Sequence, residues 1–216
     1  MGVKMRAYIE SRFFRQSILA FIGMPLFIWA AGNFPERSVL KESLSIITIM
    51  AFCQMIGQFF WARTNRYVFK DLKMSKVLKY HKFIGYTFIL ILFFHPVYLV
   101  IPRFFEAGIA PVDAFVTIIT TLNQGVVLGI IAWCLMLVLG IISFLRNKLP
   151  MKYKTWRIFH GILAALFISI SAWHVIDLGR HSNLAMAILI SMLSAGGILL
   201  LLKTYTLKKS KKTSEV

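Results

Sequence analysis

Four of the five histidines in this chain form two pairs with the same spacing. His81 and His95 are fourteen residues apart, as are His160 and His174, and each pair lies in a long apolar segment. In an α-helix, fourteen residues advance about 21 Å and return to within about 40° of the same face. Two such helices side by side present two facing imidazole pairs, which can ligate two haem irons from both axial sides. The pattern therefore predicts two stacked haems.

The apolar segments around these histidines indicate a membrane protein. The chain has 216 residues, of which 58% are hydrophobic, whereas soluble domains are about half apolar. A helix needs about 20 residues to cross a bilayer. We predict an all-α, six-helix bundle in the plasma membrane, with haems between the third and fifth helices. The predicted helices cover residues 17–31, 43–61, 83–101, 125–145, 158–176 and 184–202. The first also resembles a signal peptide, but the charge pattern favours a retained helix.

The net charge of +17 is distributed as in a membrane protein. With the N-terminus in the cytoplasm, the outer side holds only Arg37, Lys41, Arg103 and Arg180, and every other Lys and Arg lies inside. This bias predicts that both termini are cytoplasmic, including a basic tail over residues 203–216. Nucleic acid is not an expected partner, because no soluble module carries the charge. The third and fifth helices then run in parallel, which places His81 and His160 inside and His95 and His174 outside.

Each histidine taken alone has another explanation, a hydrogen bond to a carbonyl or hydroxyl group of a neighbouring helix. Four at a repeated spacing favour a cofactor, because ionisable groups inside a bilayer are costly and mark functional sites. His181 differs from them, since it lies in a short outer loop beside Arg180 and has no partner at that spacing. We predict His181 on the surface.

The sequences around the two pairs resemble the ferric reductase-like transmembrane domain. The resemblance covers about residues 10–203 and rests on Tyr80-His81-Lys82-Phe83-Ile84-Gly85-Tyr86 with His95-Pro96, and on Trp156-Arg157-Ile158-Phe159-His160-Gly161 with Trp173-His174. NADPH oxidases, ferric reductases and the membrane subunit of a periplasmic methionine sulfoxide reductase share this domain. The resemblance implies two b-type haems that carry electrons outward, with His81 and His160 ligating the inner haem and His95 and His174 the outer one. His81 favours the two-haem branch over the sulfoxide reductase subunit.

The residues after the sixth helix are too few for a flavin and nicotinamide domain. Gly196-Gly197 lies in an apolar helix, so we interpret it as close helix packing and not as a dinucleotide-binding loop. We expect a transmembrane oxidoreductase or its electron-transfer subunit, with a separate donor. The donor is a cytosolic flavin reductase, bound FMN or FAD, or quinol. The external acceptor is a ferric chelate, oxygen or a periplasmic redox protein.

Several polar residues are candidates to bind the haem propionates or the axial imidazoles. Gln54 and Gln58 lie one turn apart on the second helix, where bonding between helices is the alternative role. The candidate arginines are Arg63, Arg66 and Arg157 inside, and Arg37, Arg103 and Arg180 outside, although each also fits a topological role. Pro96 is predicted to kink the third helix.

Two other functions compete with this interpretation. A quinol-linked respiratory cytochrome b also places histidine pairs on two helices, and a six-helix transporter without haem can relay protons through histidines. The sequence offers no Ser-His-Asp arrangement and no paired carboxylates, so we assign no catalytic residue. Cys53 and Cys134 lie in separate helices without a motif and are predicted to be packing residues.

Overall fold

The computed structural model describes residues 12–65 and 73–213, and every regular element in this part of the chain is a helix. Six helical spans are long and apolar enough to cross a membrane, which confirms the predicted number. The spans are Arg12–Ala31, Val39–Gly57, Met74–Ala107, Gln124–Phe144, Tyr153–Leu178 and Leu184–Thr206. The chain is therefore a multi-pass membrane protein.

The helices follow one another along the chain in the order given below. The first span contains a π-helical turn, η1 (Leu19–Gly23), followed by α2 (Met24–Ala31). The remaining helices are α3 (Val39–Gly57), α4 (Met74–Phe93), α5 (His95–Ala107), α6 (Pro111–Thr120), α7 (Gln124–Phe144), α8 (Tyr153–Leu178) and α9 (Leu184–Thr213), with short 3-10 turns η2 (Arg63–Asn65) and η3 (Arg146–Lys148).

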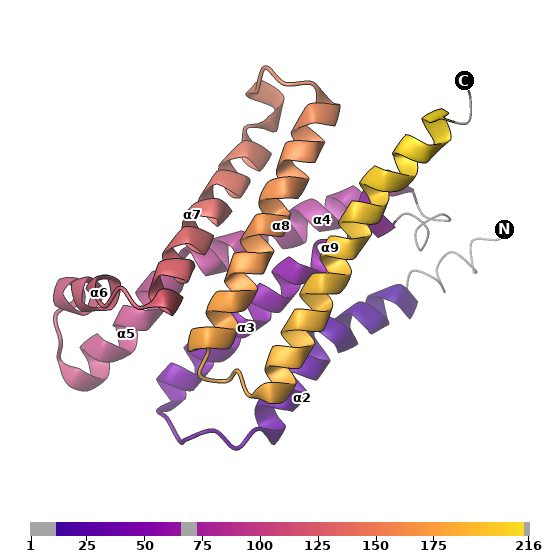
Figure 1. The fold of residues 1–216 in the computed structure, drawn as a ribbon. Coiled ribbons are helices and arrows are strands. Elements are labelled where there is room, and N and C mark those ends of the chain that lie inside the picture. Colours follow the sequence, from indigo (N-terminus) through magenta and orange to yellow (C-terminus); the bar gives the residue numbers. More distant parts are fainter. Residues whose placement is uncertain (1–11, 66–72, 214–216) are drawn as a thin grey trace.

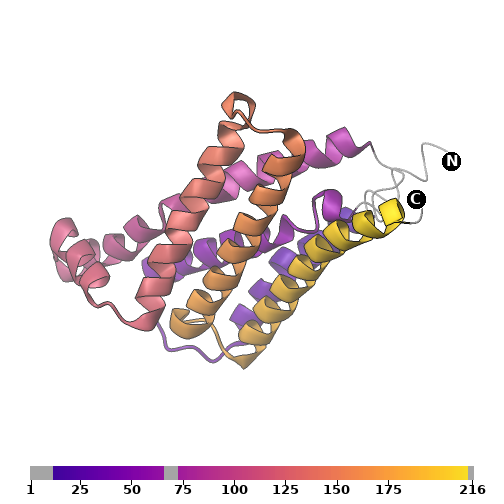
Figure 2. The same cartoon turned by 45° about the horizontal axis from the view of Figure 1, so that its top comes forward.

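Helices α7 and α8 form an antiparallel hairpin, with α8 between α7 and α9 (Figure 1). Helix α9 packs beside α8 and against α3. Figure 2 shows the same helices after a turn about the horizontal axis. The α7–α8 turn and the C-terminal end of α9 lie at one end, which we call the inner end after its predicted orientation. The α8–α9 turn and the start of α3 lie at the other, outer end. Helix α6 packs against α5 at the edge of the bundle, away from α9.

The bundle has an apolar interior and an apolar exterior. Ile56, Met136, Ile168 and Ile190 from four different helices are almost completely buried in one core. Large side chains also cover the outside, and Phe144 is 78% exposed. Exposed apolar area on this scale is unfavourable in water but contacts acyl chains in a bilayer. The exterior therefore agrees with a membrane setting.

Most differences between predicted and observed helix bounds lie where lysines interrupt the apolar segments. Helix α4 begins at Met74 and not at residue 83, and α8 begins at Tyr153 and not at residue 158. A hydropathy criterion stops at such lysines, whereas the helix continues because a long lysine side chain extends to the membrane surface. Helix α3 is shifted towards the N-terminus because Ser38 caps it, accepting a hydrogen bond from the Lys41 N–H at 3.3 Å.

The third span breaks at the position predicted from Pro96. Helix α4 ends and α5 begins around Phe94, whose backbone has φ −82° and ψ 0°. Proline removes a helical N–H donor and its ring clashes with the preceding turn. The indole N–H of Trp133 on α7 donates to the carbonyl oxygen of Phe93 at 3.2 Å, so α7 satisfies an acceptor at the break. His95 is thus the first residue of α5.

Close packing explains the glycine pair of α9. A Cβ atom added to Gly197 would lie 3.0 Å from Cβ of Phe59, just past the end of α3. Nearer the inner end, the Tyr205 hydroxyl donates to the carbonyl oxygen of Arg157 at 3.1 Å. A Cβ on Gly161 would meet that hydroxyl at 2.3 Å. Gly197 and Gly161 allow α9 to approach its neighbours, which confirms the packing interpretation for Gly197, whereas a Cβ on Gly196 would meet its nearest neighbour only at 3.7 Å.

Candidate functional site

The fold places four histidines opposite one another in two pairs. His81 on α4 faces His160 on α8, with ring centroids 6.4 Å apart and ring planes at 69°. His95 on α5 faces His174 on α8, with ring centroids 6.5 Å apart and ring planes at 77°. Because α8 is continuous between its two histidines, the pairs lie about 21 Å apart along that helix.

The spacing within each pair fits one metal ion between two imidazoles. An imidazole nitrogen lies about 1.2 Å from its ring centroid and binds a first-row metal ion at about 2.0 to 2.1 Å, so two trans imidazoles have centroids about 6.4 Å apart. In the described residues, no three His, Cys, Asp or Glu side chains gather to hold a metal ion. Each pair therefore offers two imidazole ligands to a metal ion, which is the number of protein ligands that a haem iron with two histidines requires.

The outer histidines both direct Nδ1 towards a hydrogen-bond acceptor. His174 Nδ1 lies 2.7 Å from the carbonyl oxygen of Gly125, which can only accept. His95 Nδ1 makes a long contact of 3.5 Å with Oγ1 of Thr48. Thr48 already donates its hydroxyl hydrogen to the Leu44 carbonyl at 2.8 Å, so its oxygen serves as the acceptor. With the proton on Nδ1, Nε2 of each ring carries the free lone pair.

The inner pair shows the same arrangement at His160. Its Nδ1 lies 3.2 Å from Oγ of Ser143, and Ser143 donates its own hydrogen to the Leu139 carbonyl at 2.6 Å. His81 Nδ1 is buried without a hydrogen bond, and the backbone carbonyls of Gln58 and Trp61 lie near its ring. Metal-binding histidines normally donate their second N–H to a carbonyl or another acceptor in this way, which leaves Nε2 for the metal.

Two glycines of α7 make room for His174 and for the end of α8. A Cβ atom on Gly129 would lie 2.6 Å from Cε1 of His174. A Cβ on Gly125 would lie 2.2 Å from Cγ of Leu178. Distances this short do not occur, so any larger residue would displace the imidazole or the helix. Sequence reasoning did not identify either glycine, or Thr48 and Ser143.

An aromatic stack continues from His160 towards the inner end. Trp156 lies 4.9 Å from the His160 ring at 24°, and Tyr153 lies 5.9 Å from Trp156 at 21°. The Arg146 guanidinium lies over both rings, 4.8 Å from the centroid of Tyr153 and 5.4 Å from that of Trp156. The Trp156 N–H donates to the Ile142 carbonyl at 3.2 Å, which fixes the ring. The stack restrains His160 and places a cation nearby.

Gln54 bonds to a neighbouring helix, whereas Gln58 contacts the backbone of its own segment. Gln54 Nε2 donates to the carbonyl oxygen of Phe21 in the first span at 3.3 Å, in agreement with the interhelical alternative. Gln58 Nε2 contacts the Gln54 carbonyl at 3.5 Å, and its Oε1 is buried without a partner. That oxygen lies 3.5 Å from the position of a Cβ on Gly85, one turn from His81.

The candidate arginines differ in their surroundings. Arg157 and Arg37 are partly buried, and each has a buried Nε atom without a hydrogen bond. Arg103 and Arg180 are exposed near the outer end. The side chain of Arg63 and all of Arg66 lie outside the described residues. Of the two cysteines, both free, Cys53 is buried and Cys134 is exposed.

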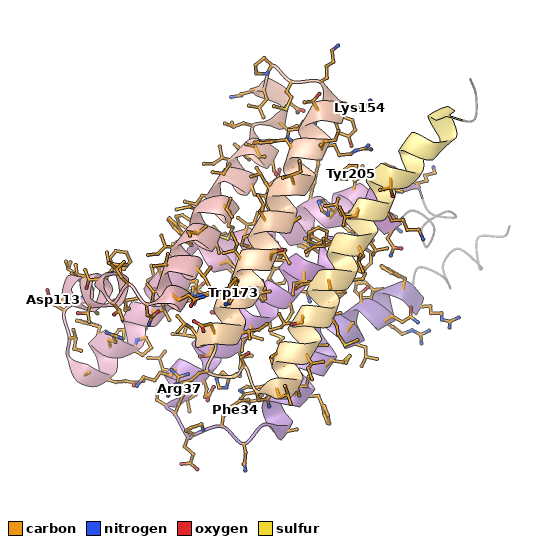
Figure 3. The ribbon with its side chains drawn as sticks, in the orientation of Figure 1. Phe34, Arg37, Asp113, Lys154, Trp173 and Tyr205 are labelled. Carbon is orange, nitrogen blue, oxygen red and sulfur yellow. The ribbon has the colours of Figure 1, made fainter. Side chains whose placement is uncertain are left out.

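The prediction that His181 lies on the surface is wrong. Its side chain is 2% exposed, and its Nε2 lies 2.9 Å from Oε2 of Glu42. Phe34 covers the ring edge-on at a centroid distance of 4.7 Å. Figure 3 shows Phe34 and Arg37 at the outer end, in the segment that precedes α3. The loop position was predicted correctly, but the segment 32–38 folds over it.

Comparison with known proteins agrees with the geometry. The family described as "Ferric reductase like transmembrane component" matches residues 47–171, which include three of the four paired histidines. An uncharacterized protein of Archaeoglobus fulgidus is 44% identical over 159 residues, covering 74% of this chain and 87% of the relative. No solved structure matches the chain.

We expect Gly129→Ala to displace the His174 imidazole, because the added methyl group would lie 2.6 Å from Cε1. Haem affinity at the outer pair should fall at least about tenfold, as when the support of a metal ligand is lost. Haem per polypeptide in the purified protein measures this effect. Gly140→Ala on the same helix is the control, since its nearest neighbour would be 3.6 Å away. Equal haem content in the two variants would contradict the assignment.

Proposed function

This chain belongs to the ferric reductase-like transmembrane family, and from that premise we propose that it transfers electrons across the membrane with two b-type haems. His81 and His160 would hold the inner haem, and His95 and His174 the outer one. Each haem iron, when bound, supplies reversible one-electron chemistry. The protein would act as a transmembrane oxidoreductase or as its electron-transfer subunit.

The observation that carries this proposal is the matched geometry of the two histidine pairs. Both pairs have the centroid separation of two trans imidazoles on one metal ion. Three of the four rings direct Nδ1 to an acceptor on a neighbouring helix, which leaves Nε2 for iron. Histidines that only link helices have no reason to share both features, so a haem-free transporter accounts for them poorly.

The depth of the pairs supports transfer across the membrane. The pairs are about 21 Å apart along α8, whereas the hydrocarbon core of a bilayer is about 30 Å thick. One pair therefore lies near each membrane surface. Between these levels, the buried side chains of Leu163, Phe167 and Ile168 on α8 are apolar. Ser171 on the same helix is also buried and is polar, so the segment between the two pairs is mostly but not wholly apolar.

The inner end fits an anionic electron donor. The segment around the α7–α8 turn carries Arg146, Lys148, Lys152, Lys154 and Arg157, and no acidic residue occurs from 146 to 157. Figure 3 shows Lys154 at this end. Such a surface attracts an acidic protein or a flavin phosphate. We infer that the donor is a cytosolic flavin reductase or bound flavin, and quinol is the alternative donor.

The outer end fits an acceptor outside the membrane. Arg103 and Arg180 are exposed there, and arginines bind anionic groups well. This favours an anionic acceptor such as a ferric chelate. Oxygen and a periplasmic redox protein are the other acceptors in this proposal.

Substituting the histidines one at a time tests the ligand assignment. His95→Ala and His174→Ala should remove the outer haem and keep the inner, and His81→Ala and His160→Ala should do the reverse. Haem per polypeptide should fall from about two to about one in each variant, because a haem bound by one axial histidine loses much of its affinity. Pyridine haemochrome assays and reduced-minus-oxidised spectra measure the content. His181→Ala is the control and should keep both haems. Full haem content in all four variants would refute the assignment.

The orientation can be tested with single cysteines. In a background without Cys53 and Cys134, Glu36→Cys and Lys154→Cys place a thiol in an exposed position at opposite ends of the bundle. The excess of Lys and Arg at the inner end predicts that a membrane-impermeant maleimide applied to intact cells labels Cys at 36 and not at 154. The opposite result would reverse the orientation.

A further inference from the structure

A buried imidazole faces a half-buried carboxylate at the outer end of the bundle. His181 in the α8–α9 turn is 3% exposed, and its Nε2 lies 2.9 Å from Oε2 of Glu42 in the first turn of α3. The contact is at ion-pair distance, although its angle is not that of a hydrogen bond. A charged or polar pair taken out of water is costly, so its retention under the Phe34 ring calls for a reason.

Several buried polar atoms around this pair have no partner in the described protein. They are Nδ1 of His181, Oγ of Ser182 and Nε of Arg37. Buried groups of this kind are normally bonded to ordered water. Nδ1 of His181 is the important atom, because Nε2 faces the carboxylate and holds the proton of the neutral ring. Nδ1 is therefore the nitrogen that can accept another proton.

The charged groups facing His181 come from three elements. Glu42 belongs to α3, Arg37 to the segment before α3, and Arg180 to the α8–α9 turn itself. Burial lowers the pKa of His181 from its ordinary 6.5, Glu42 opposes this effect, and Arg37 and Arg180 add to it. The ring is therefore neutral at pH 7.

The pair also joins the two elements that hold the outer histidines. Glu42 and Thr48 both lie on α3, about 9 Å apart along the helix, and Thr48 contacts His95. His181 follows His174 by seven residues, just past the end of α8. An electron on a group held by the outer histidine pair would add negative charge at the end of the bundle where His181 lies, and the 2% exposure of that side chain leaves little solvent to screen it. That charge raises the affinity of His181 for a proton.

We propose that His181 and Glu42 form a proton-binding site that couples proton uptake from the outside to reduction of the redox group that the outer histidine pair would hold. The electron comes from the donor at the inner end, and the proton comes from water at the outer surface. An N–H bond forms at Nδ1 of His181, and the carboxylate of Glu42 stabilises the resulting imidazolium. Oxidation releases the same proton. This inference rests on the proposed function.

Redox titrations at several pH values test the proposal on the purified full-length protein. In the wild type, the midpoint potential of the outer site should rise as the pH falls into the range where His181 takes up a proton, because proton binding favours the reduced state. His181→Asn should remove this dependence. Glu42→Gln should move it to lower pH, since the imidazolium loses its counter-ion. Glu106→Gln is the control, because this carboxylate at the same end pairs with Lys41 and lies away from the His181 ring.

A second readout counts the protons directly. With a pH-indicator dye, wild-type protein should take up more protons on reduction than His181→Asn, by up to one per chain. A pH dependence in His181→Asn and Glu42→Gln equal to that of the wild type would overturn the proton site and leave the haem assignment intact. Protein without a b-type spectrum would instead overturn the proposed function, and this inference with it.

Discussion

The orientation of the four imidazoles by helices that carry no ligand is the constraint on which the rest of the structure depends. Helix α7 supports both histidines of α8, through the Gly125 carbonyl at one level and the Ser143 hydroxyl at the other. Helix α3 and the residues that follow it support the opposite side, with Thr48 beside His95 and the carbonyls of Gln58 and Trp61 near His81. Fixed rings with a free Nε2 are pre-organised for metal binding. The close packing of α7 against α8, the break in the third span at Pro96 and the glycines of α7 all help to hold the imidazoles in these orientations.

The two ends of the bundle surround similar histidine pairs with different chemistry. At the inner end, Arg146 covers the Tyr153 and Trp156 rings that continue to His160, and lysines dominate the surface. At the outer end, a buried imidazole faces a half-buried carboxylate, with an arginine nearby. Cations suit the approach of an anionic donor, whereas a titratable pair suits the exchange of protons. This difference agrees with a direction of transfer from inside to outside.

The features that follow from helix periodicity and composition could be predicted from the sequence. The spacing of His160 and His174 on an unbroken α8 places both rings on one face, and Pro96 locates the break before α5. The groups that orient the imidazoles could not be predicted from the sequence. The side of α7 that meets α8 depends on the relative rotation of two helices that are apolar all round. An isolated Ser143 and two glycines four residues apart in α7 were the available signals. The burial of His181 depends on Phe34 and Glu42, which are distant in sequence.

The most direct test of the central claim is the number of haems bound by the wild-type chain. Purified protein from haem-replete cells would be assayed by pyridine haemochrome, with iron analysis on the same sample. The two pairs, each with the spacing of two trans imidazoles, predict two b-type haems per polypeptide. One haem would contradict the role of one pair, and a colourless protein without iron would contradict both.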